Sequence, residues 1–316
     1  MGCMFSCCCC CGVCNENHNL KYCTPKREKP DPELFPQYIQ NKQGMWLHFT
    51  GWMPPRSMPE VRGVLFVISG LGEHAARYDG VGHYFSRAGY HVFCMDNQGA
   101  GASEGERLYV VDFNDFVDDF FLFKRHVLSL HPEYAALPRF LLGHSMGGLI
   151  ATHVSLRDPT GFNAFVFSGP ALQPDPKLAT PFKKKLANML SDCTPKLGVG
   201  GIDPKAVSTN RQVVELLEQD PLYFKVKLTA RWATTMLTAM ESVWESIEKA
   251  TYPLLIVHGE KDALCPLSGS RKFIESIPSC NKRLIEYPGL GHEVLTEVRW
   301  REVLRDILTF LDSHCE

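Results

Sequence analysis

Short apolar segments alternate with longer amphipathic segments from residue 46 to the end of the chain. The apolar segments are rich in β-branched and aromatic residues, and most end at Gly, Ser or Asp, which is typical of buried strands. These predicted strands cover residues 46–50, 64–69, 91–96, 139–143, 164–168, 254–258 and 282–287. Between them, segments such as 113–130 have apolar residues at helical spacing. This alternation predicts an α/β fold with a mostly parallel sheet and helices on both faces.

Residues 170–235 depart from this pattern. No strand is expected between residues 169 and 252, where prolines and glycines recur. We expect a helical insertion that forms a cap over the carboxyl ends of the strands, where ligands bind in open α/β sheets. Phe182, Leu186 and Leu190 recur every four residues, so a helix here has an apolar face. That helix is either a mobile lid or a helix packed on the domain beneath it.

Residues 1–33 differ in composition from the rest of the chain. They hold most of the 13 cysteines and few aliphatic side chains. Gly2 followed by Ser6 fits the N-myristoylation pattern, and Cys3 is placed for palmitoylation, the second signal that stable anchoring needs. We expect a disordered, doubly acylated tail that holds the protein at the cytoplasmic face of a membrane. The alternatives are an unmodified tail or a cysteine cluster that binds metal without specificity.

The remaining residues, 34–316, are enough for one large domain with a filled core. The formal net charge of -2 gives no reason to expect a nucleic acid partner. No apolar run reaches the roughly 18 residues that a membrane-spanning helix needs. The cysteines outside the tail are scattered, which argues against a disulfide framework and for a reducing compartment.

The strongest chemical signal follows the predicted strand 139–143. Residues 143–147 read Gly-His-Ser-Met-Gly and lead into an apolar helix. This matches the nucleophile elbow of the α/β-hydrolase fold, a strained turn in which only small residues fit two positions to either side of the serine. Ser145 is therefore predicted to be a catalytic nucleophile. The alternative is a chance glycine-serine turn between a strand and a helix.

A serine hydroxyl needs a base to take its proton and an acid to orient that base. In the α/β-hydrolase fold the acid and then the base follow the serine along the chain. Asp262 comes just after the predicted strand 254–258, and His292 comes in a glycine-rich loop after the last strand. We predict these two as acid and base. Other candidates, which we expect to be structural, are His74, Asp96, His144, Asp220 and His258.

The negative oxygen of the tetrahedral intermediate needs hydrogen-bond donors that are already in place. The N–H of Met146, directly after the nucleophile, is one predicted donor. The second should come from the loop after strand 64–69, where the glycines around Leu71 allow close approach of the backbone. We expect the Leu71 N–H to be that donor.

The chain resembles the monoacylglycerol lipases from about residue 40 to its end. The stretches that carry the resemblance are Gly-Leu-Gly-Glu-His at 70–74 with Arg77 and Tyr78, Ser-Glu-Gly-Glu-Arg at 103–107 with Asp112 and Phe113, residues 143–148, and Asp-Ala-Leu-Cys at 262–265 with Gly291 and His292. The resemblance implies a serine acylglycerol hydrolase with a mobile lid, and with neither metal nor cofactor. It also implies that Glu73 and Arg77 help to place the glycerol head group.

Three positions differ from the pattern of these lipases. Ser69 and Ala100 stand where histidines are frequent, so a side-chain buttress beside the oxyanion loop is lost. Leu295 stands where mammalian members carry a histidine that contacts the glycerol moiety. The expected ester hydrolysis is independent of these changes, whereas the head-group preference depends on them.

Monoacylglycerol hydrolysis through an acyl-enzyme is the function that these features predict together. A lysophospholipase or broader carboxylesterase is the nearest alternative, and a membrane-tethered binding protein without catalysis is a third.

Cys265, three residues after Asp262, is predicted to be either a sensitive thiol in the loop of that acid or an inert packed cysteine.

Overall fold

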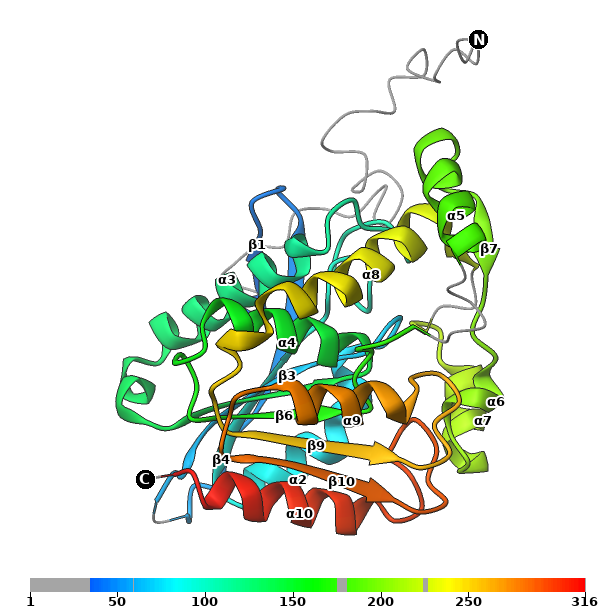
Figure 1. Cartoon of the computed structure of the whole chain (residues 1–316). Helices are drawn as coiled ribbons and strands as arrows, with labels where there is room; N and C mark the ends of the chain where they lie inside the picture. Colours follow the sequence, from blue (N-terminus) through cyan, green and yellow to red (C-terminus); the bar gives the residue numbers. More distant parts are fainter. Residues whose placement is uncertain (1–34, 59, 175–180, 224–226, 316) are drawn as a thin grey trace, which may run out of the picture.

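The structure is a computed structural model that describes residues 35–58, 60–174, 181–223 and 227–315. Its central sheet has eight strands in the order β1-β2-β4-β3-β5-β6-β9-β10 (Figure 1). The pairs from β4 to β10 are parallel, whereas β2 pairs antiparallel with both β1 and β4. The strands are β1 (Tyr38–Gln40), β2 (Trp46–Trp52), β3 (Gly63–Ile68), β4 (Tyr90–Met95), β5 (Arg139–His144), β6 (Ala164–Ser168), β9 (Leu254–Gly259) and β10 (Lys282–Tyr287).

All the strands predicted from the sequence belong to this sheet, with bounds close to those expected. β2 extends beyond the predicted residue 50 because Gly51 and Trp52 continue the ladder with Phe93 and Val92. β1 was not predicted, since its three residues are too few to show an alternating pattern. The predicted α/β architecture, a mostly parallel sheet covered by helices, is confirmed. The tail, residues 1–33, lies outside the described residues.

Helices cover both faces of the sheet (Figure 1). One face carries α2 and α10, and the other carries α3, α4, α8 and α9. These helices are α2 (Asp79–Arg87), α3 (Asn114–Leu130), α4 (Met146–Arg157), α8 (Ala230–Ser242), α9 (Leu267–Ser276) and α10 (Trp300–Asp312). Short 3-10 helices are η2 (Ala75–Tyr78), η3 (Pro132–Ala136) and η4 (Val243–Lys249). The helix predicted at 113–130 is α3.

Residues of the central strand β3 contribute alternately to two cores. Phe66 and Ile68 pack in the core beneath α3, α4 and α8, and Leu65 and Val67 pack in the core beneath α2 and α10. This alternation follows from the two-residue period of a strand. Every residue of β3 is buried, as expected of a parallel strand covered on both faces. The loop that follows Ile68 therefore starts from a rigid position.

The chain between β6 and β9 carries several elements outside the main sheet. They are α5 (Pro181–Cys193), β7 (Gly198–Gly200), α6 (Pro204–Val207), α7 (Arg211–Gln219) and β8 (Leu228–Thr229), followed by α8. The expectation that this interval has no strand is wrong, because β7 and β8 pair antiparallel. β7 reads Gly-Val-Gly and is exposed, so neither alternation nor a β-branched run marks it in the sequence.

The elements α6 and α7 lie beyond the carboxyl ends of β9 and β10 (Figure 1). They are tied to the loop between β10 and α10, where the buried Glu297 accepts hydrogen bonds from the Ser208 hydroxyl at 2.9 Å and the Thr209 N–H at 2.6 Å. In α5, by contrast, Leu186 is 40% exposed and Met189 is 55% exposed. The part of the chain that the structure describes contains no helix with both the length and the apolar character to span a bilayer.

The edge strand β2 is fixed to α2 by a close approach at Gly82. A Cβ atom at Gly82 would overlap the Trp52 indole, and the indole Nε1 donates to Asp79 at 2.9 Å. We predict that Gly82→Ala destabilises the protein by about 1–3 kcal/mol through overpacking. Gly80, in the same helix, has open space at its Cβ position, so Gly80→Ala should stabilise by up to about 1 kcal/mol. Urea denaturation measures both, and equal stability of the two variants would contradict the prediction.

Candidate active site

Ser145 lies in the sharp turn between β5 and α4. Its φ of 55° and ψ of -118° are strained for a residue with a side chain. The turn is possible because the chain passes very close to its neighbours: a Cβ at Gly143 would overlap the Gly147 carbonyl oxygen, and a Cβ at Gly147 would overlap that of Ile68. The structure thus places Ser145 as the elbow motif predicts, at the start of α4 and beside the end of β3.

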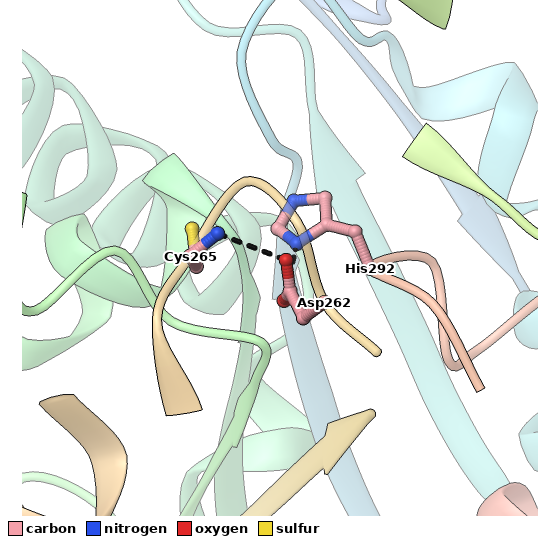
Figure 2. A group of neighbouring side chains, drawn as sticks. All are labelled: Asp262, Cys265 and His292. Carbon is pink, nitrogen blue, oxygen red and sulfur yellow. Dashed lines mark hydrogen bonds and ion pairs between the residues drawn. The ribbon is translucent and has the colours of Figure 1, made fainter. Parts of the chain in front are cut away.

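Asp262 follows β9, and it accepts four hydrogen bonds although it is buried. His292 Nδ1 lies 2.7 Å from Oδ2, and the Cys265 N–H donates to Oδ1 at 2.9 Å (Figure 2). His258 Nε2 lies 3.1 Å from Oδ2, and the Leu264 N–H donates to Oδ1 at 2.9 Å. Burial alone would raise the pKa of Asp262, but the charges and hydrogen bonds of His292 and His258 hold it below its ordinary value. Asp262 is therefore a carboxylate that orients His292.

His292 presents Nδ1 to Asp262, so its Nε2 lies on the opposite side of the ring (Figure 2). Burial would lower the pKa of His292, but the charge of Asp262 and its hydrogen bond raise it above the ordinary value. His292 and Ser145 line the same small cavity. Among the described residues no hydrogen bond joins the Ser145 hydroxyl to His292, a bond that in many enzymes forms only when substrate is bound.

His258 contributes to the site through Asp262. Besides its contact with the carboxylate, it lies 3.0 Å from the Cys265 carbonyl oxygen through Nε2 and 2.9 Å from the Ser270 hydroxyl through Nδ1. The sequence reasoning expected a structural residue and missed this support of the acid. The available signal was a histidine at the end of an otherwise apolar buried strand, since a buried polar side chain needs partners.

The predicted oxyanion donors lie on either side of the nucleophile. Met146 is the first residue of α4, whose leading N–H groups have no partner within the helix, and Leu71 lines the Ser145 cavity. In the described part of the chain, no backbone carbonyl accepts from the N–H of either residue. The Leu71 loop is held from two sides, because Glu73 Oε2 accepts from the Gly70 N–H at 2.7 Å and Asn97 Nδ2 donates to the Ser69 carbonyl at 3.1 Å.

Glu73 and Arg77 form a buried ion pair at the edge of this cavity. Arg77 Nε donates to Glu73 Oε1 at 3.2 Å, and the Tyr78 hydroxyl donates to Oε2 at 2.7 Å. Arg77 Nη2 also reaches Glu293 Oε1, at 3.3 Å. Glu293 lines the cavity together with Glu73 and Ser145, and the sequence reasoning did not single it out.

The other candidate acids and histidines have partners of their own. His74 pairs with Asp220 at 2.7 Å, which links η2 to the end of α7. Asp96 pairs with His48 at 3.0 Å and supports the loop after β4. His144 lies closer to the chemistry, since its ring centroid is 4.8 Å from that of His292. Burial and His292 lower the pKa of His144 to about 4, so it is a neutral residue.

Two cavities meet at the nucleophile. The larger has a volume of about 550 Å³, within the range of ligand sites, and its wall includes apolar side chains of Leu71, Leu108, Ile202 and Leu228. The smaller, of about 30 Å³, is the one lined by Ser145 and His292. Leu71, Ile202 and Tyr223 border both. The larger cavity therefore adjoins the one that contains Ser145.

Comparison with known proteins agrees with this geometry. Residues 59–299 match the model of a hydrolase family described as serine aminopeptidase, S33. The chain belongs to this family. It is 35% identical to a monoacylglycerol lipase of Mycolicibacterium smegmatis over 86% of the chain and 94% of that protein, and 34% identical to a monoglyceride lipase of Rattus norvegicus over 88% and 90%. The predicted resemblance to monoacylglycerol lipases is confirmed.

A solved structure shows the same similarity. The crystal structure of a Paleococcus ferrophilus monoacylglycerol lipase superposes with a TM-score of 0.73 and 28% sequence identity, covering 85% of the chain and 99% of that protein. The α/β-hydrolase fold predicted from the sequence is therefore confirmed.

In this S33-family hydrolase, two groups of side chains have the composition of metal ligands. Asp262, Cys265 and His292 form one group (Figure 2), and Glu73, His144 and Glu293 form the other; within each, the ligand atoms lie within 4.8 Å of one another. The carboxylate of Asp262 is already engaged with two histidines, and Arg77 supplies a positive charge to the second group. Contacts within the protein thus engage a carboxyl group in each of the two groups.

Cys265 is only 6% exposed, and burial together with the charge of Asp262 raises the pKa of its thiol well above the ordinary value. Because the thiolate is the reactive form, these observations favour the inert alternative over the sensitive thiol. We predict that iodoacetamide at neutral pH labels the exposed Cys193 and Cys280 before Cys265. Mass spectrometry of tryptic peptides over time measures the order, and early labelling of Cys265 with loss of activity would restore the sensitive-thiol interpretation.

Proposed function

We propose that the protein is a carboxylic ester hydrolase that cleaves monoacylglycerols to fatty acid and glycerol through an acyl-enzyme. The observation that carries the proposal is the position of Ser145, in a small cavity that shares Leu71, Ile202 and Tyr223 with a neighbouring cavity of ligand size. An acyl chain fits the larger cavity and a small head group the smaller one. The names of the relatives, which are monoacylglycerol and monoglyceride lipases, support the same substrate.

Each step of the reaction has a residue of this chain that can perform it. Ser145 Oγ attacks the ester carbonyl while His292 Nε2 takes its proton, and Asp262 stabilises the resulting imidazolium. The N–H groups of Leu71 and Met146 stabilise the tetrahedral oxyanion. His292 then gives the proton to the departing glycerol oxygen, and a water molecule, activated by the same histidine, hydrolyses the acyl-enzyme.

Charged side chains at the small cavity supply the head-group contacts. Glu73 lines the cavity beside Ser145, and Arg77, which it holds, reaches Glu293 on the same wall; the pair thereby helps to place the glycerol head group. The lining contains the carboxyl groups of Glu73 and Glu293, which favours an uncharged glycerol head group over one that carries a phosphate, such as phosphocholine.

We also propose that the protein acts at the cytoplasmic face of a membrane, held there by myristate on Gly2 and palmitate on Cys3. The support is the sequence motif and the two-signal requirement for stable anchoring. Residues 170–235 would form the cap, with α5 as its lid. The exposed Leu186 and Met189 of α5 support contact with lipid, since exposed apolar side chains gain from leaving water.

We predict that Ser145→Ala lowers hydrolysis of 1-oleoylglycerol by several orders of magnitude, about 10⁶-fold by analogy with other serine triads, with an unchanged melting temperature. Asp262→Asn should also be severe, because it favours the wrong imidazole tautomer.

Wild-type protein should prefer 1-oleoylglycerol to oleoyl-lysophosphatidylcholine, as measured by fatty acid release. A reversed preference would favour the lysophospholipase. No reaction with a fluorophosphonate probe would favour the non-catalytic binding protein.

We predict that Gly2→Ala moves the protein from the membrane to the soluble fraction of cells, because the myristoylation pattern requires glycine as the first residue after removal of Met1. Cys3→Ser should weaken attachment, since one acyl chain alone binds only marginally. Fractionation with labelled myristate measures both effects. Equal membrane fractions for wild type and Gly2→Ala, with no label in the wild type, would exclude acylation of Gly2.

A further inference from the structure

Glu293 is a buried carboxyl group that faces the reaction site directly after the catalytic histidine. It is 6% exposed and lines the small cavity together with Ser145 and His292. Its Oε1 accepts from Arg77 Nη2 at 3.3 Å, and its Oε2 accepts from the Thr296 hydroxyl at 3.1 Å. No step of the mechanism above uses it, although burying a second carboxyl group beside the nucleophile is costly.

Glu73 and Glu293, two carboxyl groups that line the small cavity, differ in how many hydrogen bonds they make. Glu73 binds the Gly70 N–H, the Tyr78 hydroxyl and Arg77 Nε, so its task is to hold the oxyanion loop and Arg77. Glu293 accepts one hydrogen bond at each oxygen, shares a proton with Glu73 and lines the cavity, so it keeps an acceptor lone pair for a ligand. Glu293 is therefore the carboxyl group that is available to substrate.

The charges around Glu293 leave it with a proton. Two carboxyl groups share the single guanidinium of Arg77, and His144, within 4.8 Å of both, is neutral. Burial and the charge of Glu73 raise the pKa of Glu293, whereas the charge of Arg77 and hydrogen bonds from the Tyr78 hydroxyl and Glu293 hold the pKa of Glu73 low against the effect of burial. The group formed by Glu73, Arg77, His144 and Glu293 is then close to neutral overall. Arg77 therefore provides no net positive charge that would attract an anion.

The position two residues after Glu293 offers no polar group for this role. Leu295, two residues on, is 4% exposed and packs in the core with Leu290 and Val294. The backbone N–H of Glu293 donates to the Val207 carbonyl at 3.1 Å, which fixes the start of the loop against α6. This bond does not involve the side chain, so the loop keeps it when the carboxyl group is replaced.

We propose that Glu293 is a specificity-determining residue that binds a hydroxyl of the head group and selects uncharged polyol esters against phosphate-bearing ones. Glu293, whose proton is shared with Glu73, accepts a hydrogen bond from a hydroxyl, whereas a phosphate beside Glu73 and Glu293 meets acceptors and like charge. The inference rests on the proposed function, in that it assigns the head-group side of the same cavity.

The test compares inhibitors that carry the two head groups but cannot be hydrolysed. Hydrolysis of p-nitrophenyl butyrate, which has no polyol, reports the free site, and 1-O-hexadecylglycerol and its 3-phosphate compete for it. Wild-type protein should bind the glycerol ether at least tenfold more tightly than the phosphate. Glu293→Val should weaken the ether about tenfold, the loss of one hydrogen bond to a buried group, and should reduce the discrimination by a similar factor.

Two further variants separate binding from folding. Leu295→Val lies in the same loop but in the core, so it should lower the melting temperature and leave the discrimination at the wild-type value. Glu293→Gln keeps hydrogen bonds to a hydroxyl and should keep most of the affinity for the ether. If Glu293→Val discriminates as wild type does, or if Leu295→Val changes discrimination as much as Glu293→Val, the assignment of Glu293 is wrong.

The pH dependence of the discrimination between the two inhibitors is a further measurement, and a purely structural role of Glu293 would not change it. Below its raised pKa Glu293 is neutral, and above it the side chain adds a negative charge that repels phosphate. Discrimination should therefore increase from about pH 6 to pH 10 in the wild type and less in Glu293→Gln. The titratable and charged groups that face Glu293 are Glu73, Arg77, Tyr78, His144, Tyr223 and His292.

This design separates the inference from the proposed function. A wild type that cleaves p-nitrophenyl butyrate but not 1-oleoylglycerol contradicts the proposed substrate, while the inhibitor series still measures whether Glu293 selects the head group. A wild type that cleaves 1-oleoylglycerol but binds the phosphate as tightly as the ether overturns the inference alone.

Discussion

A buried carboxylate with four hydrogen bonds holds the active centre together. Asp262 joins the loop after β9 to the loop after β10, because its Oδ2 contacts His258 and His292 while its Oδ1 accepts two N–H groups of its own loop. A charge removed from water is tolerated only when it is satisfied in this way. The orientation of His292, and through it the proton transfer proposed for Ser145, depends on this one group.

The parallel sheet brings the parts of the site together. β5, β9 and β10 all end at the same edge, so Ser145, Asp262 and His292, far apart in the sequence, emerge side by side. β3 lies next to β5 and carries the Leu71 loop to the same edge. The close approach of Gly147 to the Ile68 carbonyl fixes the distance between the nucleophile turn and that loop.

Local patterns were sufficient to predict the buried strands and the positions of Ser145, Asp262 and His292, because each feature is encoded by neighbouring residues. The support that His258 gives Asp262 and the contact of Glu293 with Arg77 are different, since they arise from residues that only the fold brings together. The strands β7 and β8 escaped prediction for another reason: two or three residues that pair mainly through their backbones leave no hydrophobic signature. Whether residues 170–235 move as a lid is likewise a property of the assembled chain.

The two halves of residues 170–235 are attached to the rest of the domain by different contacts. Glu297 binds Ser208 and Thr209, so α6 and α7 are coupled to the loop that holds His292. α5 is attached instead to α8, where Arg231 donates to the Ser191 carbonyl at 2.9 Å. Gly200 and Gly201 lie between the halves with open space at their Cβ positions, and Gly201 borders the larger cavity. In the cap that we propose, the α5 side is therefore the one that can move to admit an acyl chain without displacing the loop of His292.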